Sequence, residues 1–400
     1  MDQIEKLLTR GVDTIYPTRE ALEAVLRSGK KLTLYQGFDP TGTQLHIGHM
    51  VGFRKLRQFQ DLGHHVIFLI GDGTGLAGDP SGKMKARGRF MSREELRDNA
   101  KAYLMQAGKI VRFDGENPVE IRYNGDWLTA LSLQEILDIA GHFTVQQMIE
   151  RDMYQVRLKA NEPINLREFL YPLLQGYDSV AMNVDLELGG SDQMFNMLAG
   201  RTLMKAMLGK EKFVMTAPLL ADSKGVKIGK SEGNVIGLTD EPSDFYGKVM
   251  SLGDDAIIPC FTLLTDTDTE EISTIAKAIQ SGIENPMVFK KRLAYELTKM
   301  LNSEESAKTA QSAFEQRFQK GNVSDVALPE LSLASLPISG TAIEYMVAVQ
   351  LAKSNSDARR LIEQKAFKRN DVVITNPKEE LHVVAGDIFQ AGRKAVKIIS

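Results

Sequence analysis

The segment KLTLYQGFDPTGTQLHIGH, residues 31–49, contains the order of elements on which our interpretation of the fold rests. It begins with KLTLYQGF, an apolar run typical of a buried strand, and continues into DPTGTQ, which is rich in turn-forming residues. The pattern then predicts a helix from about Leu45 to Leu62. A strand followed by a turn and a helix is the repeating unit of a parallel α/β fold.

Three further apolar runs predict strands of the same buried type. They are HHVIFLIGD (64–72), VDLELGG (184–190) and KFVMTAPLL (212–220), and each lies beside a helical segment. Strands that alternate with helices indicate a parallel sheet, and such sheets bind ligands in a crevice at the carboxyl ends of the strands.

The remaining third of the chain has a different pattern. Residues 245–320 lack strand patterning and are typical of a helical layer, whereas 321–340 have the composition of a linker. After it, DARRLIEQKAF is helical, and DVVIT and KAVKII predict short strands of a small α+β module. Residues 341–400 carry ten Lys/Arg and seven Asp/Glu, a net charge of +3, against −6 for the first 340. That asymmetry is a weak signal for nucleic-acid binding.

The composition limits the class of protein. A chain of 400 residues with 43% hydrophobic and 25% charged residues is too long for one core and predicts two or three domains. Its single cysteine, Cys260, excludes an internal disulfide and, without a recognisable secretory signal, favours the reducing cytoplasm. No apolar run approaches the roughly 18–20 residues that span a bilayer.

Two glycine-rich segments resemble nucleotide-binding motifs without matching them. GTGLAG (73–78) has the glycines of a dinucleotide fingerprint, but the Pro- and Gly-rich DPSGKMKARGRF follows it instead of a helix. We interpret these glycines as shaping a loop that brings the backbone close to a ligand and places Asp79 where it can meet a cation. GVKIGKS (225–231) has three residues before its Gly-Lys-Ser, where a P-loop has four.

His46 and His49 are three residues apart at the predicted start of a helix, so both rings lie on one face. Gly48 between them leaves room for a flat ring against the backbone. Free N–H groups at a helix N-terminus bind phosphates. A pair of surface histidines explains the spacing equally well, and a metal site would need a third ligand that the spacing does not provide.

The segment YPLLQGYD, residues 171–178, predicts a polar stripe on a helix. At 100° per residue, Tyr171, Gln175 and Asp178 fall within roughly 60° on one face. A solvated face of an amphipathic helix gives the same pattern. Inside a crevice, the stripe would offer two acceptors and a phenol to a ligand with an ammonium at one end and a hydroxyl at the other.

These motifs together resemble a known family. HIGH after a strand and a loop, with KIGKS downstream, is similar to the paired signatures of class I aminoacyl-tRNA synthetases. KIGKS departs from the usual KMSKS at Ile228 and Gly229, and the glycine implies a more flexible loop. YQGFDPTGTQLHIGH, GDPSGK, YPLLQGYD and GGSDQ occur in the order and spacing of bacterial tyrosyl-tRNA synthetases, and the tail SNSDARRLIEQKAF resembles their S4 RNA-binding module.

The resemblance implies a fold and an activity. We expect a Rossmann-like catalytic domain over residues 1–240 with an inserted connecting segment at about 100–165. A helical domain (241–330), a linker (331–340) and an S4-like module (341–400) would follow. The expected reaction joins L-tyrosine and ATP into tyrosyl-adenylate with release of pyrophosphate, then transfers tyrosine to the 3′ end of tRNA(Tyr). The resemblance also implies Mg²⁺ accompanying ATP, no tightly bound cofactor, and a cytoplasmic homodimer with its interface around residues 120–165.

The resemblance assigns a role to each motif residue. Tyr35 and Asp178 would hold the hydroxyl of the substrate, and Asp79, Tyr171 and Gln175 its ammonium. Gln193 would lie near the carboxylate, with Gly37 and Asp39 beside the adenylate. Asp192 would bind the ATP ribose, although it is equally placed to cap the next helix. The residues expected around ATP and its phosphates are Thr41, His46, Gly48, His49, Lys83, Arg87, Lys227, Lys230 and Ser231. Those expected to contact tRNA are Arg359, Arg360, Lys365, Lys368 and Arg369.

One departure and two alternatives remain. Some relatives have a threonine near the ribose where this chain has Gly52, so nucleotide contacts there are expected to differ. A tryptophanyl enzyme shares the fold and both signatures, but an indole has no hydroxyl to satisfy the Tyr35/Asp178 pair. A non-catalytic RNA-binding relative would not need His46, His49 or the loop lysines.

Overall fold

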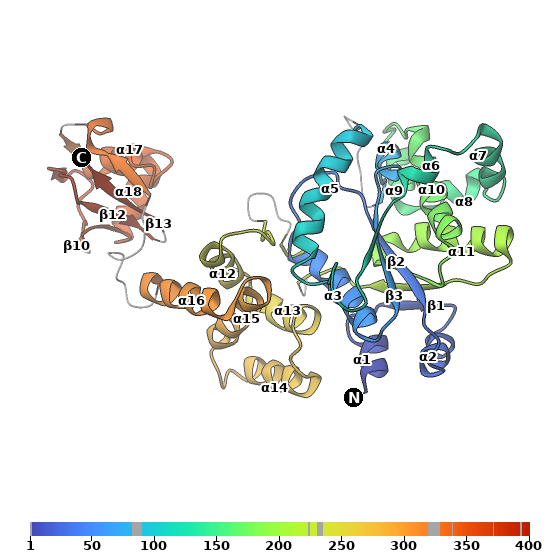
Figure 1. Cartoon of the computed structure of the whole chain (residues 1–400). Helices are drawn as coiled ribbons and strands as arrows, with labels where there is room; N and C mark the ends of the chain where they lie inside the picture. The colour runs from blue at the N-terminus through green and yellow to red at the C-terminus, as the bar shows by residue number, and fades with distance from the viewer. Residues whose placement is uncertain are drawn as a thin grey trace. The chain divides into compact units, whose positions relative to one another are not determined.

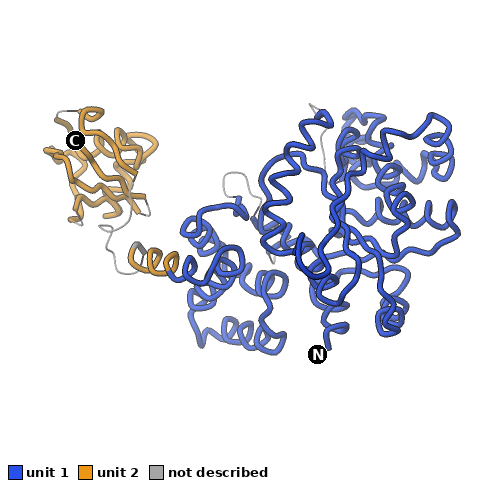
Figure 2. Tube along the Cα trace, viewed as in Figure 1, with its two compact units in different colours: residues 1–308 blue, residues 309–400 orange. Residues whose placement is uncertain are grey.

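The structure, a computed structural model, describes residues 2–81, 90–222, 225–229, 235–318, 329–337, 339–370, 372–392 and 394–400 (Figure 1). The chain forms two compact units, residues 1–308 and 309–400 (Figure 2). Among the described residues, no helix is both long and apolar enough to cross a membrane.

A six-stranded sheet forms the centre of the first unit, with the strand order β1-β6-β5-β2-β3-β4. Its strands are β1 (Thr14–Tyr16), β2 (Thr33–Phe38), β3 (His65–Ile70), β4 (Glu120–Tyr123), β5 (Leu186–Gly190) and β6 (Phe213–Ala217). All neighbours pair in parallel except β1, which is antiparallel to β6. From β2, the chain builds β3 and β4 on one side, while β5 and β6 lie on the other. The strand order therefore reverses between β2 and β5, the position at which parallel sheets open a binding crevice.

Helices cover both faces of this sheet. Figure 1 shows α3 (Ile47–Asp61) and α5 (Arg93–Ala107) on one face, and α10 (Leu166–Met182) and α11 (Met194–Leu208) on the other. Helices α10 and α11 approach closely because Gly176 has no side chain. A Cβ atom at that position would lie 3.0 Å from the backbone nitrogen of Gly200. The glycine in YPLLQGYD thus allows the close packing of α10 against α11.

Smaller helices complete the first unit. Those packed around the sheet are α1 (Gln3–Thr9), α2 (Arg19–Arg27), α4 (Thr74–Ala77), α6 (Gly125–Leu128), α7 (Leu133–Ala140), α8 (Val145–Ile149) and α9 (Asp152–Lys159). The predicted helical segment is observed as α12 (Pro242–Met250), α13 (Ile257–Leu264), α14 (Thr269–Gln280), α15 (Pro286–Leu301) and α16 (Glu304–Phe318). The boundary between the two units lies within α16, after residue 308. Arg10 joins this layer to the N-terminal segment, since its guanidinium donates to the carbonyl oxygens of Phe261, Thr262, Thr265 and Thr267.

The second unit contains a small α+β module. A five-stranded sheet has the order β10-β9-β12-β13-β7, and β8 pairs with β11. The elements are β7 (Glu330–Ser332), β8 (Gly340–Thr341), α17 (Ala342–Ala348), α18 (Asn355–Glu363), β9 (Phe367–Arg369), β10 (Val372–Val373), β11 (Glu380–Leu381), β12 (Ile388–Ala391) and β13 (Lys394–Ile399). Its core is apolar and includes Tyr345, Ile362, Phe367 and Phe389.

Three segments have a structure other than the one expected for them. β4 lies inside the segment expected as an insertion at about 100–165, yet it pairs with β3 in the main sheet. β7 lies at the start of the expected linker and pairs in parallel with β13. Residues 74–77, expected as loop, form the short helix α4. These elements are short and lack an apolar period, so only their tertiary partners define them.

Candidate active site

Two adjoining cavities open where the strand order reverses. The larger, about 390 Å³, is lined by twelve of the predicted residues, which are Tyr35, Gly37, Asp39, Thr41, His49, Asp79, Tyr171, Gln175, Asp178, Asp192, Gln193 and Lys227. The smaller, about 270 Å³, is lined by the predicted His46, Gly48, His49, Asp192 and Lys227. Gly37 and Gln193 line both cavities, so the two spaces are continuous. Lys83, Arg87, Lys230 and Ser231 lie outside the described residues.

Asp178 lies at the bottom of the larger cavity and is 1% exposed. Its carboxylate accepts hydrogen bonds from Trp127 Nε1 at 2.8 Å and Asn124 Nδ2 at 2.9 Å. Burial raises the pKa of Asp178 well above its ordinary value, and these two donors act in the opposite direction by stabilising the charged form. Tyr171 is also buried, so the polar stripe of α10 is not a solvated face.

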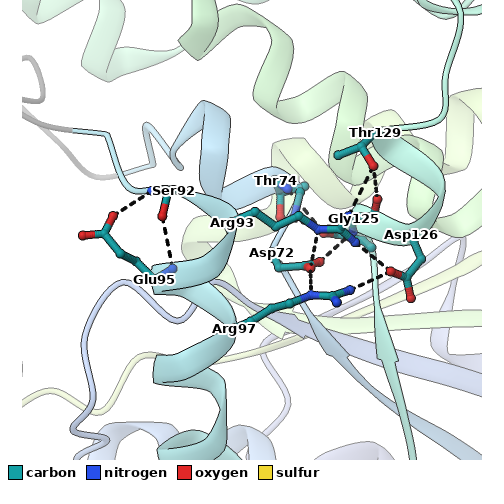
Figure 3. Close-up of polar contacts among 11 residues, drawn as sticks. Asp72, Thr74, Ser92, Arg93, Glu95, Arg97, Gly125, Asp126 and Thr129 are labelled. Carbon is teal, nitrogen blue, oxygen red and sulfur yellow. Dashed lines mark hydrogen bonds and ion pairs between the residues drawn. The ribbon is translucent and has the colours of Figure 1, made fainter.

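A network of ion pairs holds the segment that carries Asn124 and Trp127. Asp72, which follows β3, is fully buried and accepts from Arg93 Nε at 2.8 Å and Arg97 Nε at 2.6 Å (Figure 3). The same carboxylate accepts from the backbone N–H of Gly125 at 2.7 Å, at the first residue of α6. Asp126 Oδ1 forms ion pairs with Nη2 of Arg93 and Nη2 of Arg97. Helix α5 thereby fixes α6, and α6 fixes the donors to Asp178.

Helix α5 begins where this network requires it. Ser92 and Glu95 form a capping box in which each side chain accepts from the backbone N–H of the other residue (Figure 3). Arg93 is the first residue of the helix, and Arg97 follows one turn later on the same face.

Tyr35 on β2 lies at the same end of the cavity as Asp178. Its phenol is buried and hydrogen-bonds Ser179 Oγ at 2.9 Å. Burial raises the pKa of Tyr35 well above its ordinary value, and the nearby carboxylates of Glu187 and Asp178 act in the same direction. The residue therefore remains a neutral phenol that can exchange hydrogen bonds with a ligand.

A second group of acceptors lines another part of the same cavity. Asp79 Oδ2 accepts from Gln193 Nε2 at 3.0 Å, and its Oδ1 accepts from the backbone of Ser81 at 2.8 Å. Burial raises the pKa of Tyr171 well above its ordinary value, followed in effect by the charges of Asp39 and Asp79. One carboxylate and these neutral dipoles form an environment suited to a ligand cation.

The histidine pair forms the start of α3. His46 is the N-cap residue, and its Nδ1 accepts from the backbone of Gly48 at 3.1 Å. The two rings have centroids 4.1 Å apart. A Cβ atom at Gly48 would lie 2.9 Å from the ring of His46, so the glycine makes room for that ring. Both rings therefore face the smaller cavity beside the N–H groups of the helix terminus.

Two glycines that depart from the family pattern have structural explanations. A Cβ atom at Gly52 would lie 2.6 Å from Gln36 Oε1, so the long Gln36 side chain fills the space that a residue at 52 would otherwise use. Gly229 has a φ of +80° and lies against Ile47, where a Cβ atom would approach to 2.7 Å. The backbone conformation and the contact with Ile47 therefore favour glycine at this position. Lys227 Nζ lies 3.7 Å from Asp192 Oδ2.

The predicted tRNA contacts in the second unit differ in exposure. Arg359, Arg360 and Lys365 are exposed, on α18 or just after it. Lys368 is half-buried on β9. Arg369 donates to Asp387 Oδ2 at 2.6 Å and to the carbonyl oxygen of His382, so its guanidinium already has a structural role.

The chain matches known proteins over nearly its full length. The family model described as "tRNA synthetases class I (W and Y)" covers residues 27–319. A tyrosine–tRNA ligase of Dehalococcoides mccartyi is 41% identical over 394 residues, covering 98% of this chain and 97% of that protein. The chain belongs to the class I tyrosine–tRNA ligases. The predicted family, fold class and enzymatic function are confirmed.

Further relatives agree. A tyrosine–tRNA ligase of Moorella thermoacetica is 41% identical and covers 97% of this chain and 94% of its own length. Among solved structures, a C-terminally truncated mitochondrial tyrosyl-tRNA synthetase of Aspergillus nidulans has a TM-score of 0.65 at 25% identity, covering 79% of this chain and 94% of that one. The tyrosyl-tRNA synthetase of Archaeoglobus fulgidus is 22% identical with a TM-score of 0.60, covers 78% and 100%, and shares the fold.

Sequence reasoning missed the residues that support the cavity of this ligase. Asn124, Trp127, Ser179, Glu187 and Lys212 were not predicted, although each lies in the cavity or contacts a residue that does. Glu187 is the one with a sequence signal, because it interrupts the apolar run VDLELGG in the middle of a buried strand.

Proposed function

We propose that the larger cavity binds L-tyrosine, with its hydroxyl between Tyr35 and Asp178 and its ammonium near Asp79, Tyr171 and Gln175. The observation that carries this proposal is the buried carboxylate of Asp178, which is held by two donors and lines the cavity. A carboxylate has about four acceptor positions, so it can accept one more hydrogen bond from a hydroxyl. Phenylalanine would leave that acceptor unpaired, a discrimination for which tyrosyl enzymes are the standard example.

The smaller cavity binds ATP in this proposal, with the ribose near Asp192 and the phosphates near His46, His49 and Lys227. The carboxylate of bound tyrosine attacks the α-phosphorus, and the bond to the bridging oxygen breaks with release of pyrophosphate. The nucleophile is already ionised, so the step needs no general base. Catalysis then consists of placing the two substrates in line and stabilising the charge that develops on pyrophosphate.

Magnesium and the cellular site follow from the reaction. Mg²⁺ would enter with ATP, held chiefly by phosphate oxygens, as it is in many nucleotide-using enzymes. The proposed reaction takes place in the cytoplasm, where bacterial tRNA is charged.

Pyrophosphate exchange tests the tyrosine site. Asp79→Asn and Asp178→Asn should each lower the tyrosine-dependent exchange rate. Asp79→Asn removes a carboxylate beside the ammonium of the proposed ligand, and Asp178→Asn removes one beside its hydroxyl. Asp98→Asn is the matched control, since that carboxylate is 66% exposed and lies outside both cavities. Full exchange activity in both Asp79→Asn and Asp178→Asn would reject the site.

The second unit would bind tRNA through Arg359, Arg360, Lys365, Lys368 and Arg369. Support comes from the net positive charge of the tail and from the exposure of the first three. A truncated protein that ends before residue 329 lacks β7 and the sheet to which β7 belongs. It should retain pyrophosphate exchange and lose most tRNA charging. Equal charging by the truncated and full-length proteins would reject this role.

A homodimer would use the face formed by α7–α10. Support comes from exposed apolar side chains there, namely Leu133, Leu137, Val145, Val156, Leu158, Leu166 and Leu170. Exposed apolar patches of this kind mark interaction surfaces. Sedimentation should give twice the chain mass for the wild-type protein and a monomer for Leu133→Asp/Leu137→Asp. A monomeric wild-type protein would reject the dimer.

A further inference from the structure

A buried ion pair lies at the wall of the larger cavity, which Glu187 lines. Lys212, just before β6, and Glu187, on β5, are both fully buried and form a direct ion pair. The ammonium of Lys212 is enclosed by α11, because a Cβ atom at Gly200 would lie 2.5 Å from Nζ. Replacing a buried ion pair with apolar residues is often neutral or stabilising, so stability alone does not explain this pair.

At one end, the pair fixes the orientation of Gln175. Glu187 Oε1 accepts a hydrogen bond from Gln175 Nε2 at 3.0 Å. A carboxylate can only accept, so the amide cannot turn over without placing two acceptors against each other. Gln175 Oε1 is left buried, with no hydrogen-bond partner among the described residues, in a side chain that lines the cavity. That oxygen is an acceptor held ready for a donor such as an ammonium.

At the other end, the pair fixes the direction of the hydrogen bond between Ser179 and Tyr35. Lys212 Nζ donates to Ser179 Oγ at 2.8 Å, and an ammonium can only donate. The single proton of Ser179 can then go to Tyr35 at 2.9 Å or to Glu187 Oε2 at 3.4 Å, and the shorter contact is to Tyr35. With Ser179 as donor, Tyr35 keeps its own proton to donate. The acceptors for that proton are Glu187, whose hydrogen bond helps to raise the pKa of the phenol, and the oxygen of a bound ligand.

We propose that Glu187 and Lys212 are positioning residues that set the hydrogen-bond direction at both ends of the amino-acid cavity. Through Gln175, the pair provides an acceptor for the ammonium of tyrosine. Through Ser179, it makes Tyr35 a donor to the hydroxyl of tyrosine, whose own proton goes to Asp178. The inference rests on the proposed roles of Gln175 and Tyr35 as ligands of the substrate.

Glu187→Gln tests the ammonium end with little change in shape. A glutamine at 187 can donate to Gln175 Oε1, which turns the amide and places its NH₂ toward the ligand ammonium. Because phenylalanine carries the same ammonium, kcat/KM should fall by about tenfold for tyrosine and phenylalanine alike. The loss should appear as a higher KM for the amino acid, with the KM for ATP and the tyrosine-to-phenylalanine ratio unchanged.

Ser179→Ala tests the hydroxyl end independently. It removes the proposed donor to Tyr35, so kcat/KM for tyrosine should fall by about threefold to tenfold while that for phenylalanine stays the same. A purely structural role would lower both amino acids together or change the KM for ATP. Thermal unfolding of each variant shows whether the fold is retained, and Ser179→Thr, which restores the hydroxyl, should recover part of the ratio.

The outcomes separate this inference from the proposed function. Asp79→Asn is measured in the same assay. In the proposed function Asp79 contacts the ammonium of tyrosine directly, so this variant tests the cavity without changing Glu187 or Lys212. If Asp79→Asn lowers kcat/KM and Glu187→Gln does not, the positioning role is wrong and the cavity assignment stands. If neither changes it, the cavity assignment itself is wrong. A tyrosine-to-phenylalanine ratio that is unchanged in Ser179→Ala contradicts the role assigned to the hydroxyl end.

Discussion

The larger cavity of the first unit and the α18 region of the second unit present charge in opposite ways. In the cavity, Asp178, Glu187 and Lys212 are withdrawn from water and held by several partners each. Around α18, Arg359 and Arg360 are exposed over an apolar core. Buried polar groups discriminate strongly because an unpaired one costs free energy, whereas exposed cations interact weakly and are screened by salt. One region is thus suited to selecting a small molecule, and the other to holding a polyanion.

The largest effect should follow from changing Asp178, where the contrast is most direct. Asp178→Asn removes the charged acceptor and presents an NH₂ to the donors Asn124 and Trp127. We expect kcat/KM for tyrosine to fall by about a hundredfold, and that for phenylalanine much less. Tyr35→Phe should lower the ratio of kcat/KM for tyrosine to kcat/KM for phenylalanine less than Asp178→Asn does, since it removes one hydrogen bond. An unchanged ratio in Asp178→Asn would mean that the hydroxyl is recognised elsewhere.

The second largest effect should come from the ion-pair network around Asp72. Asp72→Asn removes the buried charge that Arg93, Arg97 and the N–H of Gly125 share and leaves the arginines only the exposed Asp126. The free energy of unfolding should therefore fall by about 2 kcal/mol. KM for tyrosine should also rise, because α6 carries donors to Asp178. Asp126→Asn, at an exposed carboxylate, should cost at most about 1 kcal/mol. Urea unfolding measures both, and equal losses would remove the distinction between buried and exposed members.

Acid should destabilise the first unit through His64. Burial lowers the pKa of His64 to about 4, and its Nδ1 accepts from the backbone of Leu32 at 3.1 Å. Between pH 6.5 and 4 the unfolded chain binds a proton that the folded protein does not, so stability falls as pH falls. At pH 5, the free energy of unfolding should be lower than at neutral pH by about 2 kcal/mol because of this histidine.

The control for this pH effect lies in the other unit. His64→Gln should flatten the dependence of unfolding free energy on pH in this range, whereas His382→Gln, at an exposed position, should not. If the two variants have the same pH profile as the wild type, burial of His64 does not control acid stability.

The smallest effects should come from single cations of the second unit. Arg359→Ala and Arg360→Ala should each weaken tRNA binding by a few-fold, and each should reduce the slope of log affinity against log salt by about 1. Lys378→Ala is the matched control, because Lys378 is exposed and is not among the residues predicted to contact tRNA. Filter binding at several salt concentrations measures the slope. A loss that does not depend on salt would contradict a phosphate contact and bring the two regions closer in behaviour.

Much of the fold could be predicted from local sequence. The apolar runs that became β2, β3, β5 and β6 are continuous because both faces of these strands are buried, and periodicity detects that. The residues of the HIGH and YPLLQGYD segments were also identifiable, since each motif places several functional side chains on one short element. β1, β4 and β7 were not predicted, because a short strand is defined by its neighbours and not by its own composition.

By itself, the sequence determined which side chains share one face of a strand or helix, because strand and helix periods orient residues close together in the chain. Only the tertiary structure decided what holds those side chains. Asp178 is separated by 54 residues from Asn124, and Lys212 by 33 residues from Ser179 and 25 from Glu187. No local pattern encodes such pairs. They form because the parallel strands and their crossover helices bring distant segments to the same buried position, where an unpaired polar group costs free energy.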